Sequence, residues 1–211
     1  MTRSVPHTSV TVCRTCGRMP PPNDRRRAQI TDAAITLLTE AGVHGVTHRA
    51  ADSKAGLPTG TASNYFRSRE ALLVAVTRRV AELHQADMAD AAATTDVGGN
   101  AIEHLVELIA GSLLHSATAE RDRYLAIFEL RLESLRRPAL AAALDTLTEA
   151  MAAYTAAYHS QLRLEIPPDA VRPLMALYGG ALFTLITAPP ETVTPATTQE
   201  LATAIVRGAI G

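Results

Sequence analysis

The stretch from Thr47 to Phe66 limits the fold more than any other part of this chain. Thr47 can cap a short helix running through Ala55, because a threonine hydroxyl accepts a hydrogen bond from a free amide at a helix start. Gly56 supplies the positive φ of a sharp turn. Pro58 then suits the first turn of another short helix, which ends at about Phe66. Two short helices joined by a tight glycine turn are typical of the helix-turn-helix motif.

The preceding segment has the periodicity of a longer helix that supports this pair. Its apolar residues recur at helical spacing from Asn23 onward, at Ile30, Ala34, Leu37, Leu38 and Ala41. These positions share one helix face, and Gly42 ends the helix. We therefore expect a three-helix domain over residues 23–67. Residues 1–22 contain three arginines, no acidic residue and a triple proline, so we expect a disordered basic tail there.

The charges are divided unevenly along the chain. Residues 1–84 contain 12 Lys and Arg against 6 Asp and Glu, a net charge of +6, whereas residues 85–211 contain 8 against 15, a net charge of −7. Arg25, Arg26 and Arg27 stand in the first turn of the first helix, where the macrodipole disfavours each cation by about 0.3–1 kcal/mol at low salt. An anionic partner would reverse this penalty. The alternative is a solvated arginine run.

The sequence from Thr47 to Leu73 resembles the DNA-binding signature of the tetracycline repressor (TetR) family of bacterial transcriptional regulators. The matching elements are a Thr cap, a turn Gly, a Gly-Thr pair, an aromatic-Phe pair and a charged helix start, here Thr47, Gly56, Gly60-Thr61, Tyr65-Phe66 and Ser68-Arg69-Glu70. The resemblance covers residues 24–85 in detail and is only architectural beyond them. It departs at Ala51 and Asp52, where the family usually has a branched aliphatic and a small residue. Either Arg49 or a backbone amide could satisfy the Asp52 carboxylate near the domain core.

The resemblance implies which residues contact a double-stranded DNA operator. Phosphate contacts come from the start of the first helix, the Thr47 cap, Tyr65 and residues 67–69, and they set the register without reading sequence. Base contacts come from the start of the recognition helix, which lies in the major groove. Asn64 is the sharpest candidate, because its amide pairs with adenine, whereas the Thr61 hydroxyl has helix packing as its alternative. The expected DNA-binding residues are Arg25, Arg26, Arg27, Thr47, His48, Arg49, Thr59, Gly60, Thr61, Ser63, Asn64, Tyr65, Arg67 and Arg69.

The rest of the chain reads as a series of further helices. A long helix runs from Ser68 toward Ala93, and others are expected at about 100–117, 121–136, 139–163, 168–188 and 195–209, separated by breaks that contain Pro or Gly. The predicted fold class is therefore all-α. An N-terminal helix-turn-helix domain precedes a helical effector-binding and dimerisation domain over residues 68–211, as the resemblance implies.

An arginine lies on an aromatic stripe of the helix that begins near residue 121. At 100° per residue, Arg131 projects between Tyr124 and Phe128. A buried cation needs a partner, so Arg131 is a candidate to receive an acidic or carbonyl-bearing effector of unknown identity. The alternatives are an ion pair with Glu103, Glu107 or Glu129, or a snorkelling stem. Met151, Tyr154 and Tyr158 form a second stripe on a later helix. This stripe either lines the same cavity or belongs to the ordinary core. The candidate ligand-binding residues are Tyr124, Phe128, Arg131, Met151, Tyr154 and Tyr158.

The helix over residues 169–188 is apolar enough to be buried all round. The resemblance implies that the last two helices of each protomer pair into a four-helix dimer interface. A homodimer presents two recognition helices related by twofold symmetry, and this symmetry matches a palindromic operator. The expected interface residues are Leu174, Leu177, Tyr178, Ala181 and Leu185. The most plausible function on this evidence is a ligand-released repressor.

Other classes of protein fit less well. Cys13 and Cys16 lack the second ligand pair of a zinc site, so we expect a reduced, cytoplasmic protein. The uncharged stretch over residues 173–190 is interrupted and slightly too short for a bilayer, so no membrane partner is expected. We expect no catalytic set, bound metal or cofactor. The rival hypotheses are a helical small-molecule binding protein that no longer binds DNA, and a thiol or metal sensor acting through the two cysteines.

Overall fold

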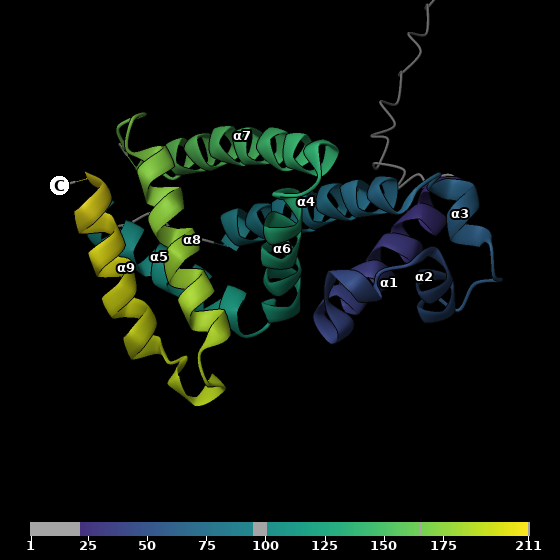
Figure 1. The fold of residues 1–211 in the computed structure, drawn as a ribbon. Coiled ribbons are helices and arrows are strands. Elements are labelled where there is room, and N and C mark those ends of the chain that lie inside the picture. The colour runs from purple at the N-terminus through teal and green to yellow at the C-terminus, as the bar shows by residue number, and fades with distance from the viewer. Residues whose placement is uncertain (1–21, 95–100, 165, 211) are drawn as a thin grey trace, which may run out of the picture.

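The computed structural model describes residues 22–94, 101–164 and 166–210, and within these ranges the regular elements are all helical (Figure 1). The helices are α1 (Pro22–Gly45), α2 (His48–Lys54), α3 (Thr61–Tyr65), α4 (Arg69–Thr94), α5 (Ala101–Ala117), α6 (Arg121–Ser134), α7 (Pro138–Gln161), α8 (Val171–Thr187) and α9 (Pro195–Ile210), with a short 3-10 turn at Pro190–Thr192. The predicted all-α class is confirmed, and the five last helices agree with the expected ranges to within about one helical turn.

Three local signals near the start of the chain are confirmed. Gly42 leaves the helical region, with φ 63° and ψ −175°, so the regular part of α1 ends where the sequence indicated. Thr47 caps α2 by accepting a hydrogen bond from the Ala50 amide at 3.1 Å. Gly56 has φ 64° and makes the turn after α2. Each signal depends only on residues within a few positions of it.

The third helix begins later than expected. It starts at Thr61 and not at Pro58, because Gly60 has φ 94°, which lies outside the helical region. Residues 58–60 form a turn, and in it the Thr61 amide donates to the Pro58 carbonyl at 3.1 Å. The recognition helix therefore has five residues.

The first of two hydrophobic cores crosses the boundary expected after residue 67. It contains Ile30 and Leu38 of α1 and Leu72 of α4, together with small residues of α2 and α3. It continues into α6 and α7 through Leu130 and Leu140. The helix-turn-helix region is thus packed directly onto the helices that follow it.

The second core lies between α5, α8 and α9, with contributions from α6 and α7. Figure 1 shows α8 and α9 at the opposite end of the molecule from α2 and α3. Leu113 of α5 and Ile186 of α8 are fully buried there. No helix within the described ranges is long and apolar enough to cross a membrane.

Candidate functional site

The Asp52 carboxylate is buried between α2 and α3, with only 1% of the residue exposed. Its Oδ2 accepts a hydrogen bond from the Gly60 amide at 2.7 Å, and its Oδ1 accepts one from the Ala62 amide at 2.6 Å. Arg49 is exposed. Backbone amides at the start of α3 therefore satisfy this carboxylate, which settles the alternative that the sequence left open.

The outer side of α3 carries the residues expected to read bases. Thr59, Ser63 and Asn64 are exposed. The Ser63 hydroxyl donates to the Gly60 carbonyl at 2.8 Å, and the half-buried Thr61 donates to the Pro58 carbonyl at 2.5 Å. The Thr61 hydroxyl therefore has a local partner in the turn before α3. The Asn64 amide makes no side-chain hydrogen bond to the described part of the chain and faces solvent.

The end of α3 is braced against the start of α1. The Arg27 guanidinium lies 4.9 Å from the centre of the Phe66 ring, and its Nη1 donates to the Tyr65 carbonyl at 3.4 Å. The Tyr65 hydroxyl donates to Asn23 Oδ1 at 3.3 Å. Arg27 therefore has a partner on α3 although it is exposed.

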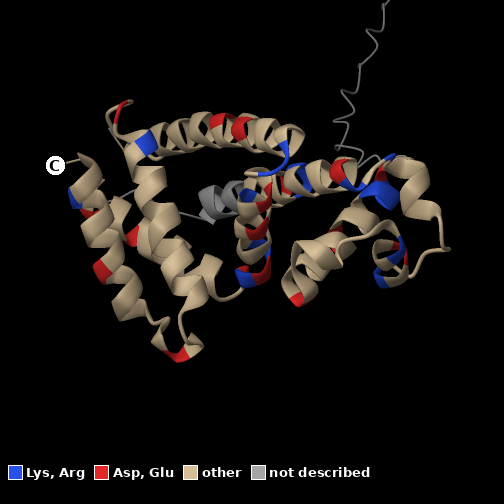
Figure 2. Ribbon diagram, viewed as in Figure 1, with Lys and Arg blue, Asp and Glu red and all other residues tan. Residues whose placement is uncertain are grey.

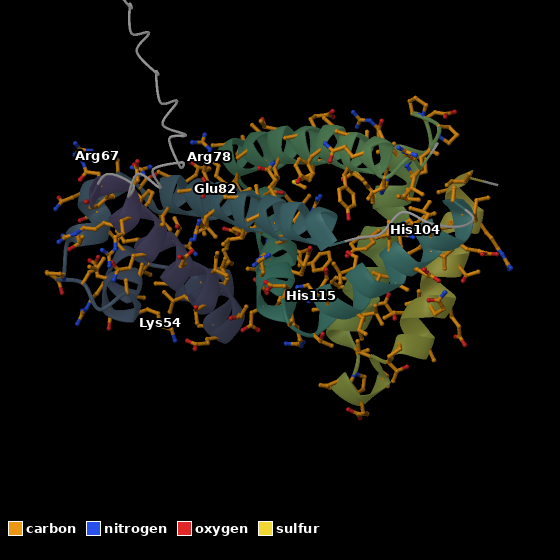
Figure 3. The ribbon with its side chains drawn as sticks, turned by 180° about the vertical axis from the view of Figure 1, so that it is seen from behind. Lys54, Arg67, Arg78, Glu82, His104 and His115 are labelled. Atoms are coloured by element: carbon orange, nitrogen blue, oxygen red, sulfur yellow. The ribbon has the colours of Figure 1, made fainter. Side chains whose placement is uncertain are left out.

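The other expected phosphate contacts form an exposed basic edge near this brace. Arg25 and Arg26 on α1 and Arg67 before α4 are all exposed. Figure 3 shows Arg67 at the outer end of this region, on the side of the molecule away from α8 and α9. The edge is positioned by α1 and by the chain leaving α3.

Two residues expected at the DNA surface make internal bonds instead of pointing freely outward. His48 Nε2 lies 2.8 Å from the Phe66 carbonyl oxygen, to which it donates. Arg69 is half-buried, and its Nε donates to the Val46 carbonyl at 2.7 Å while its Nη2 donates to the Val43 carbonyl. Arg69 thus fastens α4 to the corner between α1 and α2, which leaves fewer of its N–H groups for a phosphate.

A cluster of charges that the sequence reading missed joins α6 to that corner. Glu129 Oε2 accepts a hydrogen bond from the Val43 amide at 3.3 Å. Glu133 is buried and accepts from Arg137 Nε at 2.5 Å. This hydrogen bond, with the charges of Arg137, Arg69 and Arg136, lowers the pKa of Glu133 against the opposing effect of burial. In the sequence, only the spacing of Glu129 and Glu133 by four residues indicated that these two carboxylates share one face of the helix.

Two tyrosines among the candidate ligand residues converge on α4. The Tyr124 hydroxyl lies 2.7 Å from His84 Nδ1, and the two rings meet edge to face at 5.9 Å. The Tyr154 hydroxyl donates to the Gln85 carbonyl at 3.4 Å. Met151, one helical turn before Tyr154 on α7, is buried. The aromatic region therefore borders the middle of α4.

The expected position of Arg131 inside this region is wrong, because Arg131 is exposed. The buried face of α6 is centred on Ala126, Leu130 and Glu133, which turn toward α1, α4 and α7. The aromatic stripe consequently lies at the edge of the buried face. Phe128 is half-buried and contacts the Phe183 ring edge to face at 5.0 Å.

Two hollows in the surface lie elsewhere. One of about 850 Å³ is lined by residues of α1, α2 and α4, including Gln29 and Arg79. The other, of about 490 Å³, lies between the end of α7 and the start of α8 and includes His159 and Arg163. Neither hollow contains a candidate ligand residue, so neither supports the expected effector cavity.

The residues expected at a dimer interface on α8 differ in their exposure. Leu174 and Leu185 are buried in the second core, and the Tyr178 hydroxyl lies 2.8 Å from Ser112 Oγ on α5. Ala181 is half-buried in the same core. Leu177 is 42% exposed and lies beside Gly208 of α9. Most of the expected set therefore packs within the protomer, because α8 needs its apolar side to cover α5 and α9.

Beyond Arg172, which is itself exposed, the exposed face of α8 is uncharged. Arg172 is the one charged residue in the sequence of α8, and the helix is otherwise tan in Figure 2. The other exposed residues of this helix are Pro173, Ala176, Leu177, Gly180, Phe183, Thr184 and Thr187. Their spacing forms a continuous stripe of small and apolar side chains along the helix.

Within the described ranges, no group of three or more His, Cys, Asp or Glu side chains is placed to hold a metal ion. Figure 3 shows His104 and His115 near opposite ends of α5. Cys13 and Cys16 lie outside the described residues.

Two family models match the chain. Residues 30–76 match "Bacterial regulatory proteins, tetR family", and residues 100–211 match "Tetracyclin repressor-like, C-terminal domain". The regulator BetI of Burkholderia thailandensis is 40% identical over 55 residues, or 26% of this chain. That match spans only 28% of the length of this relative.

Solved structures resemble nearly the whole fold. The multidrug binding protein EbrR, complexed with ethidium, has a TM-score of 0.63 and 27% identity over 85% of this chain and 98% of its own. A transcriptional regulator from Rhodococcus sp. Rha1 has a TM-score of 0.68 over 87% of this chain and 95% of its own, and its 14% identity supports the fold alone. With a C-terminal model that covers more than half of the chain and an N-terminal model over the helix-turn-helix, the chain belongs to the TetR family of bacterial transcriptional regulators.

Proposed function

We propose that this regulator is a repressor that binds a palindromic DNA operator as a homodimer and is released by a small-molecule effector. The observation that carries the proposal is the outer side of α3, where Ser63 and Asn64 are exposed on a helix braced at both ends. An asparagine amide on such a helix can pair with adenine in the major groove. Arg25, Arg26 and Arg67 form a basic edge beside it that suits phosphates.

The uncharged stripe on α8 supports the homodimer. It runs along a helix at the far end of the molecule from α3, with Leu177 and Phe183 exposed by 42% and 47%. If the stripe of one copy packs against the stripe of a second copy across a twofold axis, both stripes are buried. The resulting dimer carries two recognition helices. A symmetric pair of readers selects a palindrome, with half-site centres about 34–36 Å apart or a multiple of that distance.

The region around Tyr124 and Tyr154 is the proposed effector site. Both side chains bond to the middle of α4, which leads directly into the helix-turn-helix. EbrR, a relative in fold, is complexed with the aromatic ligands ethidium and proflavin. With Arg131 exposed, the reason to expect an acidic effector is gone, and we propose a flat aromatic ligand instead. Such a ligand shifts the protein only by its differential affinity for the two states.

Selection of bound fragments from a pool of random duplexes tests the proposal. The full chain should recover one palindromic site, with an affinity that falls steeply as salt rises, because phosphate contacts release counterions. Light scattering should give the mass of a dimer. Binding that ignores sequence at every salt concentration would overturn the repressor function, and a monomer on the selected duplex would overturn the homodimer.

A further inference from the structure

The recognition helix is too short to hold its own position. α3 has five residues, and helices of this length are unstable without packing or capping. Gly60 precedes it and has no side chain with which to cap the first amides. These amides must therefore find acceptors elsewhere.

One side chain from the neighbouring helix supplies two of these acceptors. The Asp52 carboxylate accepts from the amides of Gly60 and Ala62, at 2.7 and 2.6 Å. A buried carboxylate at a helix start also gains from the helix dipole, and hydrogen bonds to a charged acceptor are stronger than neutral ones. The Asp52 carbonyl further accepts from the Leu57 amide at 2.9 Å. The start of α3 is thus fixed to α2 chiefly through Asp52.

The other end of α3 has separate supports. His48 bonds to the Phe66 carbonyl, and Tyr65 bonds to Asn23 of α1. Loss of Asp52 would therefore free only the start of α3, while its end stays held. The exposed residues that flank the two bonded amides are Thr59 and Ser63, which are both on the expected base-reading surface.

We propose that Asp52 is a positioning residue for base recognition, which it serves by holding the start of the recognition helix at a fixed distance from α2. It touches no base itself. This inference rests on the proposed function, because it assigns Asp52 a part in operator specificity. Phosphate contacts from α1 and from Arg67 do not depend on it, so non-specific DNA affinity is independent of Asp52.

The test compares affinity for the selected operator with affinity for a random duplex. In Asp52→Ala, operator affinity should fall about tenfold, the effect of losing a strong helix cap. Affinity for the random duplex should change by no more than about twofold, because it comes from phosphates. Asp52→Asn keeps one oxygen acceptor and should lie between the two. The expected result is a graded loss of the ratio of specific to non-specific affinity.

Two control variants separate positioning from charge and from stability. Asp32→Asn removes the same charge from the exposed side of α1, where Asp32 pairs with Arg79, and should leave the ratio unchanged. Val76→Ala opens a cavity in the first core from α4 and leaves the Asp52 hydrogen bonds in place, so it tests the effect of lower stability. If Val76→Ala reduces the ratio as much as Asp52→Ala does, Asp52 is only a stabilising residue and the inference is wrong.

Amide hydrogen exchange gives a readout that needs no DNA. The Gly60 and Ala62 amides should exchange faster in Asp52→Ala than in the unaltered protein, while the Phe66 amide, which bonds to the Ala62 carbonyl, should stay protected. An unchanged ratio or unchanged exchange in Asp52→Ala would overturn this inference alone. An unaltered protein with no preferred sequence would overturn the proposed function and this inference with it.

Discussion

The helix-turn-helix region and the region around α5, α8 and α9 each have an apolar core, and they differ in the hydrogen bonds added to it. In the first, directed hydrogen bonds between elements fix the geometry, such as those from Asp52 to α3 and from Arg69 to the corner before α2. In the second, apolar side chains such as Leu113, Leu182 and Ile186 provide most of the contact. Directed bonds fix one arrangement of backbone and side chain, whereas apolar packing tolerates several helix rotations. The first region therefore suits the reading of a sequence, and the second suits adjustment to a ligand or a partner.

The largest expected effect tests whether the two regions are joined through α6. Leu130→Ala removes a fully buried side chain from the first core, so the free energy of unfolding should fall by about 2–5 kcal/mol. Urea unfolding followed at probes in both regions should show one shifted transition. Leu132→Ala, two residues along α6 and 58% exposed, is the matched control and should change stability by less than about 0.5 kcal/mol. An unshifted transition for the helix-turn-helix would show that the regions unfold independently.

The next effect tests the directed chemistry of the reading surface. Asn64→Ala should weaken operator binding by about 1–3 kcal/mol and relax the preference at one base pair. Joint replacement of the exposed Arg25, Arg26 and Arg67 by Ala should instead weaken all sequences alike and flatten the salt dependence. Filter binding across a set of single-base operator variants distinguishes the two patterns. An unchanged base preference in Asn64→Ala would mean that another residue of α3 reads that position.

A smaller effect concerns the charged cluster between the regions. Glu133 has a lowered pKa in the folded protein, so it binds fewer protons there than in the unfolded chain. Its contribution to stability is present above its ordinary pKa and is lost as the pH falls through the folded value. Glu133→Gln should cost about 1 kcal/mol near neutral pH, because Arg137 is partly exposed. The variant should also lose less stability than the unaltered protein as the pH falls below about 5.

Thermal melting from pH 7 to pH 3 measures this difference. Glu149→Gln is a suitable control, because it removes the same charge from an exposed ion pair, the one between Glu149 and Arg172. If the melting temperatures of the unaltered protein and of Glu133→Gln fall equally with pH, carboxylates other than Glu133 cause the loss of stability in acid.

The smallest effect sharpens the description of the effector region. Arg131 is exposed, so Arg131→Met should change the free energy of unfolding by less than about 0.5 kcal/mol. It should also leave operator release by an aromatic ligand unchanged. Release measured by fluorescence anisotropy beside a thermal melt covers both points. If the ligand no longer releases the operator from Arg131→Met while the melting temperature is unchanged, Arg131 belongs to the ligand site after all.

The reading surface was predictable where its signals are local. The Thr47 cap, the positive φ of Gly56 and the end of α1 at Gly42 follow from residues a few positions apart, and all three are found. The late start of α3 was missed, because Pro58 is compatible with a first helical turn and only the conformation of Gly60 excludes it.

The faces of the later helices were harder to predict than their ranges. Arg131 and Tyr124 share a stripe on a helical projection, yet one is exposed and the other buried. The projection gives relative angles on one helix, but it does not say where the neighbouring helices lie. α8 shows the same limit, because a helix apolar on every side offers no signal for which side meets α5 and α9.

The sequence by itself determined the all-α class, the order of the helices and the local caps and turns, since these depend on backbone preferences and on contacts within one helical turn. The tertiary structure alone decided the partners of Asp52, the carbonyls that hold Arg69 and the side of α8 left open to solvent. These features join residues from different elements. They therefore depend on how the helices pack, and no spacing along one helix encodes that packing.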